Sequence, residues 1–139
     1  MEAGVTGLGS RRKGQAGERE VAAIIRDLLG VNARRAVRQH AGDSDILGVP
    51  GWSLEVKRQD KPLVRQWWAQ TVEQAEAASL LPALFYRLPR RPWRVMWPLS
   101  CVMVQQRSSD WMDVEFAADT TPEAWAAVVR EIRSGERFA

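Results

Sequence analysis

The sequence predicts an α/β domain in which helices pack on a mixed β-sheet. Apolar residues recur at helical spacing in three separate segments, near residues 14–29, 62–80 and 122–133. Short apolar segments bounded by turn residues lie between these helices, and the order helix, three strands, helix, strands, helix is typical of a layered α/β fold. A chain of 139 residues, 45% of them hydrophobic, is long enough to bury one core.

The first expected elements are a leader, a helix and a strand. Residues 1–10 are rich in glycine and predict a flexible leader, followed by a single domain over residues 11–139. Valine, isoleucine and leucine recur at helical spacing from about Gly14 to Leu29, where Gly30 is a suitable helix end. An exposed strand is expected over residues 33–39, where apolar residues stand among arginines.

A hairpin is expected next, because residues 45–49 and 52–58 are short apolar segments joined through Pro50 and Gly51, which suit a turn. Pro62 can open a second helix that runs to about residue 80, and Pro82 would end it.

The last third of the chain predicts further strands and one helix. Strands are expected over residues 83–88 and 93–103, the second of them broken near Pro98. Thr121 and Pro122 give a cap and first-turn signal for a last helix that ends near Arg133. Beyond about residue 100 the chain is an acidic extension. Its segment from Ser108 to Val129 holds five acidic residues and no basic one, so we expect this segment to face away from DNA.

Composition narrows the class of protein. Residues 1–100 hold sixteen arginines and lysines against ten acidic residues, an excess typical of proteins that bind a phosphate backbone but also found in basic proteins that do not. The single cysteine, Cys101, excludes an internal disulfide and favours a reducing compartment, so a cytoplasmic location is expected. A signal peptide or a membrane span is not expected, because no apolar stretch is long enough.

Three charged residues on the predicted hairpin carry the chemistry. On a strand, Ser53, Glu55 and Lys57 share one face, and Asp45 lies on the preceding strand. Buried carboxylates that converge need compensating charge, and a hard divalent cation is suited to carboxylate oxygens. On the first helix, Glu18 is in line with the apolar stripe, whereas Glu20 points to solvent. The pattern predicts a magnesium-dependent nuclease site; a structural ion cluster is the alternative.

Other catalytic designs lack their residues. One histidine, His40, and one cysteine cannot form a four-ligand zinc site, and no phosphate-binding G-x-x-x-x-G-K-[ST] motif is present. Neither Ser44 nor Ser53 is surrounded by the sharp turn that a serine nucleophile requires. Carboxylate ligation of a metal is what remains.

Arginines and lysines flank the proposed site. They lie at the start of the first helix or on the segment that follows it. They can hold phosphates without reading bases, although a solvated surface is the alternative. A second group of arginines, near residues 87–94, either extends this basic surface or lies exposed on a loop. The flanking residues are Arg11, Arg12, Lys13, Arg19, Arg34, Arg35 and Arg38.

The chain contains four segments in a characteristic order and spacing: K-G-Q-A-G-E-R-E, A-V-R-Q-H-A-G, S-D-I-L-G and L-E-V-K. With them it resembles the archaeal-type Holliday junction resolvases of the PD-(D/E)xK nuclease superfamily. Phages carry similar proteins. The likeness covers about residues 11–98. It implies a restriction-endonuclease-like mixed sheet flanked by helices, and a homodimer that cuts a four-way DNA junction with Mg²⁺, for which Mn²⁺ substitutes.

The resemblance also implies roles for individual residues. Glu18, Asp45 and Glu55 correspond to the metal-site acids, the Val56 carbonyl to a further metal ligand, and Lys57 to the catalytic lysine. Arg19 and Arg38 correspond to junction-phosphate contacts. The full set of expected DNA contacts is Arg11, Arg12, Lys13, Arg19, Arg38 and Arg58.

The sequence departs from the family at two places. Ser44 stands where many members of the superfamily have proline, and the chain beyond about residue 100 has no counterpart that can be aligned. Two rival functions therefore stay open. One is a nuclease of the same superfamily that cuts flaps, ends or a restriction site, and the other is a DNA-binding module of the same fold without turnover.

Overall fold

The computed structural model describes residues 3–37, 44–103 and 109–134. Within these ranges the α-helices are α1 (Ala3–Leu29), α2 (Val64–Ala77) and α3 (Pro122–Ser134). The strands are β1 (Arg34–Arg35), β2 (Ile46–Leu47), β3 (Trp52–Arg58), β4 (Leu81–Arg87), β5 (Arg94–Pro98) and β6 (Ala117–Thr120), and short 3-10 helices cover Leu99–Val102, Ser109–Met112 and Val114–Phe116.

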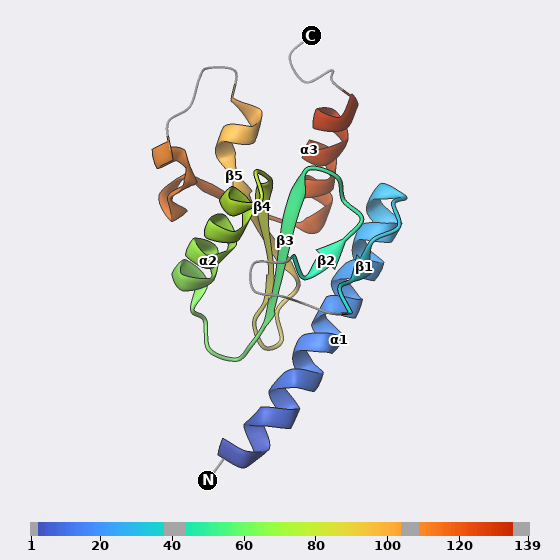
Figure 1. Ribbon diagram of the computed structural model, residues 1–139, viewed down its shortest axis with the longest axis vertical. Coiled ribbons are helices and arrows are strands. Elements are labelled where there is room, and N and C mark those ends of the chain that lie inside the picture. Colours follow the sequence, from blue (N-terminus) through green and yellow to red (C-terminus); the bar gives the residue numbers. More distant parts are fainter. Residues whose placement is uncertain (1–2, 38–43, 104–108, 135–139) are drawn as a thin grey trace.

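In the described part of the chain, the six strands form one mixed sheet in the order β1-β2-β3-β4-β5-β6 (Figure 1). Strands β3 and β4 run parallel and are connected through α2, whereas the other neighbouring pairs are antiparallel. The predicted hairpin is present, since Ile46 of β2 pairs with Leu54 of β3. The expected α/β class with a mixed sheet is therefore confirmed.

Helices cover both faces of the sheet. On one face, α1 and α3 pack against alternate residues of the central strands, among them Leu54, Phe85 and Val95. On the other face, Trp67 and Trp68 of α2 pack against the intervening residues of β4 and β5. Because side chains alternate along a strand, Glu55 and Lys57 belong to the α2 face and Val56 to the α1 face.

Helix α1 is longer than the sequence predicted. It begins at Ala3 rather than near Gly14, so most of the expected leader over residues 1–10 is helical, and its N-terminal part extends beyond the sheet (Figure 1). Glycines weaken a helix without forbidding it, and no proline interrupts this segment. Among the described residues, every helix is too short or too polar to cross a bilayer.

One sequence signal, Pro82, has a different role from the one expected. Helix α2 ends at Ala77, before Pro82, and the chain turns where Ser79 has a φ of 57° and the Leu80 N–H donates to the Ala75 carbonyl at 2.8 Å. Pro82 is the second residue of β4. Gly48 is needed after β2, because a Cβ there would lie 2.3 Å from the Asn32 carbonyl oxygen.

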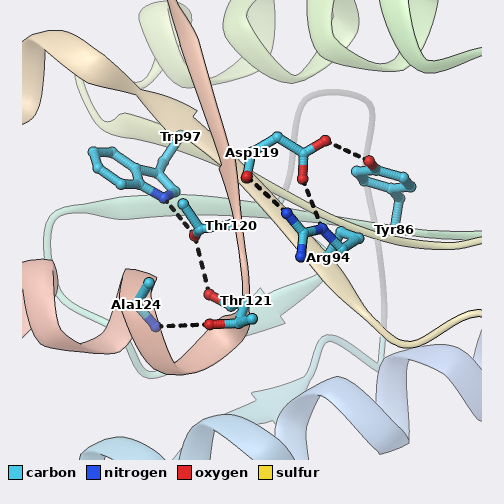
Figure 2. Close-up of polar contacts among 7 residues, drawn as sticks. All are labelled: Tyr86, Arg94, Trp97, Asp119, Thr120, Thr121 and Ala124. Carbon is cyan, nitrogen blue, oxygen red and sulfur yellow. Dashed lines mark hydrogen bonds and ion pairs between the residues drawn. The ribbon is translucent and has the colours of Figure 1, made fainter.

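Strand β6 and helix α3 belong to the body of the domain, whereas the sequence predicted no strand at residues 117–120. Asp119 anchors β6 to its neighbours: it accepts hydrogen bonds from the Tyr86 hydroxyl and the Arg94 guanidinium (Figure 2). Burial and the Asp119 carboxylate raise the pKa of Tyr86 to about 12, so the hydroxyl keeps the proton that it donates. The predicted cap of the last helix is confirmed, since the Thr121 hydroxyl accepts from the Ala124 N–H at 3.2 Å.

Trp125 fixes α3 to the sheet. Its side chain is fully buried and meets Trp52 and Phe85 edge to face, at ring-centroid distances of 5.6 and 5.1 Å.

We expect Trp125→Ala to lower the free energy of unfolding by about 3–5 kcal/mol, because it leaves a cavity between α3 and the sheet. Urea unfolding followed by circular dichroism measures this. The half-buried Trp111 provides the control, since Trp111→Ala should cost much less. Equal losses in the two variants would mean that α3 does not depend on this contact.

Candidate active site

Asp45 is held at the edge of β3 by backbone groups. Its own N–H donates to the Leu54 carbonyl at 2.8 Å, and its carbonyl accepts from the Ala36 N–H at 2.9 Å. Its side-chain Oδ2 accepts from the Val56 N–H at 2.9 Å. The carboxylate therefore takes the place that a longer β2 would fill, and its orientation is fixed by the main chain rather than by flexible side chains.

The carboxyl group of Glu55 lies against that of Asp45. Both residues are only 9% exposed, and a hydrogen bond joins the two side chains. Burial, the Asp45 charge and this hydrogen bond raise the pKa of Glu55 from 4.5 to about 9, and the more distant Glu18 adds a smaller effect. Two buried carboxyl groups in contact hold a proton between them in the absence of a cation, because both cannot be charged at low cost.

Lys57 lies two residues after Glu55 on the same face of β3. Its ammonium charge lowers the pKa of Glu55 and so opposes the effect of burial. Its side chain is half-buried, in contrast to the exposed lysine at position 61. The structure therefore brings Asp45, Glu55 and Lys57 into one cluster on the β2–β3 hairpin, as the sequence predicted.

Glu18 approaches this cluster from α1 but is held by another partner. Its Oε1 accepts from Arg35 Nε of β1 at 3.1 Å, and both side chains are largely buried. Within residues 3–37, 44–103 and 109–134, no three acidic, histidine or cysteine residues are close enough together to hold a metal ion. The structure thus brings two of the three expected acids together, while Glu18 pairs with Arg35.

The donor set suits a hard divalent cation. Two carboxyl groups in contact supply oxygen ligands, and a cation would replace the proton that they share. The N–H and C=O of one strand residue point to the same side, so the Val56 carbonyl lies on the same edge of β3 as the Val56 N–H that binds Asp45. The single cysteine, Cys101, is buried in the core beyond β5 and away from this site.

The expected DNA contacts that the structure describes lie on α1 and at the end of β3. Arg11, Arg12 and Arg19 are exposed along α1. Lys13 forms an ion pair with Asp60, and Arg58 lies at the end of β3. Arg38, like the single histidine, His40, lies outside the described residues.

The sequence predicted that Glu20 points to solvent, and this prediction is wrong. Its carboxylate binds Arg58 at 2.7 Å and Arg87 at 2.9 Å, and it accepts a hydrogen bond from the Trp93 indole at 3.2 Å. The reason is that the ends of β3 and β4 lie beside α1 on this side, so they meet a helix face that is polar in sequence. Helical periodicity gives the direction of a side chain but not what lies there.

The mixed sheet, with two acids in contact and a lysine beside them on the β2–β3 hairpin, is the arrangement expected of the PD-(D/E)xK class. The comparisons agree: a family model described as "Phage putative PDDEXK endonuclease" matches residues 9–129, and the chain belongs to this family. Family membership makes it a nuclease by class. A search of the curated proteins finds none that matches the chain.

Among solved structures, the fold is similar to that of Archaeoglobus fulgidus Hjc, a Holliday junction resolvase from an archaeal hyperthermophile. The TM-score is 0.52, the sequence identity is 19%, and the match covers 81% of this chain and 99% of that chain. At this identity the likeness concerns the fold.

The raised pKa of Glu55 predicts how stability changes with pH in the absence of divalent cations. Between about pH 5 and pH 9 the folded protein keeps a proton that the unfolded chain has lost, so the free energy of unfolding should fall as pH rises, by at most about 1.4 kcal/mol per pH unit. Glu55→Gln should flatten this slope. Urea unfolding in EDTA at several pH values measures it, with the exposed Glu73→Gln as control; equal slopes for wild type and Glu55→Gln would contradict the prediction.

Proposed function

We propose that this protein is a Mg²⁺-dependent endonuclease that cuts branched DNA, with the four-way junction as its substrate. Hydrolysis of the phosphodiester would leave a 5′-phosphate and a 3′-hydroxyl. The observation that supports this best is the contact of the buried Asp45 and Glu55 carboxyl groups beside Lys57, in a chain of the PD-(D/E)xK class.

Asp45, Glu55 and the Val56 carbonyl would hold the cation, and Mn²⁺ should replace Mg²⁺ because both accept oxygen ligands. When bound, such an ion neutralises charge on the scissile phosphate and makes a water more acidic. Asp45 is positioned for this role by its hydrogen bond from the Val56 N–H. Glu18 would support the site from α1, after releasing Arg35 or together with it.

Lys57 would act on the reacting groups from the same strand. An ammonium on a flexible stem can donate to an attacking water or to a phosphate oxygen, and it compensates the negative charge that develops there. Seventeen of the 20 cationic side chains in this protein are arginine, so lysine is the less common choice in this chain.

Two points support branched DNA as the substrate. The fold is similar to that of Hjc, a Holliday junction resolvase, over 99% of that chain. Arginines and lysines are in excess in residues 1–100, which contain the whole candidate site. A four-way junction offers two equivalent strands, so we propose that the protein acts as a homodimer that places one site on each of them.

We expect Glu55→Gln and Lys57→Ala each to reduce the single-turnover rate of junction cleavage by at least about 100-fold, because each removes a group that acts on the scissile phosphate. Binding of the junction, measured by fluorescence anisotropy in Ca²⁺, should change little. Matched controls are Glu73→Gln and Lys61→Ala, which alter exposed residues of the same types. Normal turnover in both site variants would refute the assignment.

Substrate selectivity is tested on one synthetic four-way junction and a linear duplex of the same arm sequence, with each strand labelled separately. We expect symmetric paired incisions in the junction with Mg²⁺ or Mn²⁺ and none in EDTA. Equal cutting of the linear duplex would indicate a nuclease for another DNA substrate. Absence of nicking on every DNA tested would favour a binding module without turnover.

A further inference from the structure

A small basic pocket lies on the side of the sheet that α1 covers, where β3 and β4 end. Four cationic side chains line it, together with Gln59, and its volume is about 90 Å³. Pockets that hold drug-sized molecules are several times larger, so a space of this size suits a small anion and not a nucleoside. The four cationic residues are Lys13, Arg58, Arg87 and Arg90.

Glu20 fixes two of these cations in place. One carboxylate oxygen binds Arg58 and the other binds Arg87, and the Trp93 indole donates to the second oxygen. Arg87 also donates from Nε to the Arg91 carbonyl at 2.9 Å, so its guanidinium is held from two directions. An anion would therefore meet donors that are already oriented, and little side-chain freedom would be lost when it binds.

The pocket keeps a net positive charge despite its acids. Glu20 and Asp60 offset two of the four cations, since Asp60 pairs with Lys13. Within residues 3–37, 44–103 and 109–134, no acidic group forms an ion pair with Arg90.

The backbone at Arg90 is strained in a way that suggests a reason for the arginine. Arg90 has a φ of 61°, in the left-handed region that glycine and asparagine adopt more readily. A turn with this conformation would be easier to form with either of those residues. Non-glycine residues in this conformation cluster at active sites and ligand-binding sites, although Ser79 shows that a plain turn can also adopt it.

We propose that this pocket binds one backbone phosphate of the DNA strand that is cut, near the scissile phosphate. Glu20 would be a positioning residue, which holds Arg58 and Arg87 ready for that phosphate. The proposal rests on the function proposed above and specifies where the substrate is held. Arg58 of the pocket follows Lys57 on β3, and Glu18 and Glu20 lie within one turn of α1. The pocket and the candidate active site are therefore neighbours along both elements, on opposite faces of β3. A phosphate contact there would set the register of the strand without reading its bases.

The variant Glu20→Gln tests the proposal through the sign of its effect. Removal of a negative charge should strengthen DNA binding if only net charge matters. If Glu20 holds Arg58 and Arg87 in place, the same change should instead weaken binding of the junction, and we expect a loss of severalfold or more. Fluorescence anisotropy in Ca²⁺ measures it, and tighter binding by Glu20→Gln would overturn the proposal.

Arg90→Asn provides a second test that does not depend on the stability of the Glu20 cluster. Asparagine suits the left-handed conformation, so the melting temperature should stay the same or rise, while junction affinity falls. The slope of log affinity against log salt should decrease in magnitude by about 0.9, as expected for one lost phosphate contact. Arg90→Lys should keep most of this slope, and Arg65→Gln on α2, whose arginine pairs with Glu115, should leave it unchanged.

These binding measurements are separate from cleavage. If the protein nicks no DNA but Glu20→Gln and Arg90→Asn both weaken binding, the pocket assignment stands and the nuclease function fails. If cleavage is normal and Arg90→Asn binds with the affinity and salt slope of the wild type, the pocket assignment is overturned and the nuclease function stands.

Discussion

The contact between the buried carboxyl groups of Asp45 and Glu55 is the interaction on which the site depends. Two anions in such surroundings repel each other, and the raised pKa of Glu55 expresses that cost. The fold imposes the contact nonetheless. Glu55 lies in the middle of a seven-residue strand with a partner strand on each side, and Asp45 is fixed by main-chain hydrogen bonds to Leu54 and Val56. A protein gains from such an arrangement where a cation takes the place of the shared proton.

Two elements serve two neighbouring polar clusters at once. On α1, Glu18 pairs with Arg35 and adds a small charge effect at Glu55, whereas Glu20 holds two arginines of the basic pocket. On β3, Lys57 and the next residue, Arg58, point to opposite faces. The helix can lie this close to the strand because residue 17 is glycine, where a Cβ would come within 3.2 Å of the Arg58 Cβ. The same close approach places Glu20 beside Arg58, so that the two side chains form an ion pair.

The sequence was sufficient for the elements whose signals are local. The hairpin of β2 and β3, the α2 stripe and the cap of α3 follow from alternation, 3.6-residue periodicity and a threonine-proline pair. Strand β6 was missed because Ala117–Thr120 is short and has no apolar alternation; it becomes a strand by pairing with β5 and through the hydrogen bonds of Asp119. Pro82 was misplaced because a proline can begin a strand as well as end a helix.

For the site, sequence reasoning found the residues that share one hairpin and missed partners that are distant in the chain. Asp45, Glu55 and Lys57 lie within thirteen residues, so the geometry of two paired strands places them together. The ion pair of Glu20 with Arg87 spans 67 positions, and it forms only because the parallel β3–β4 pair carries the end of β4 to α1. Periodicity defines the direction in which a helix side chain points, but topology decides which element it meets. A helix face that the sequence predicts to be exposed becomes a contact face wherever a crossover brings another strand next to it. For this reason Glu20, predicted to face solvent, holds two arginines of the basic pocket.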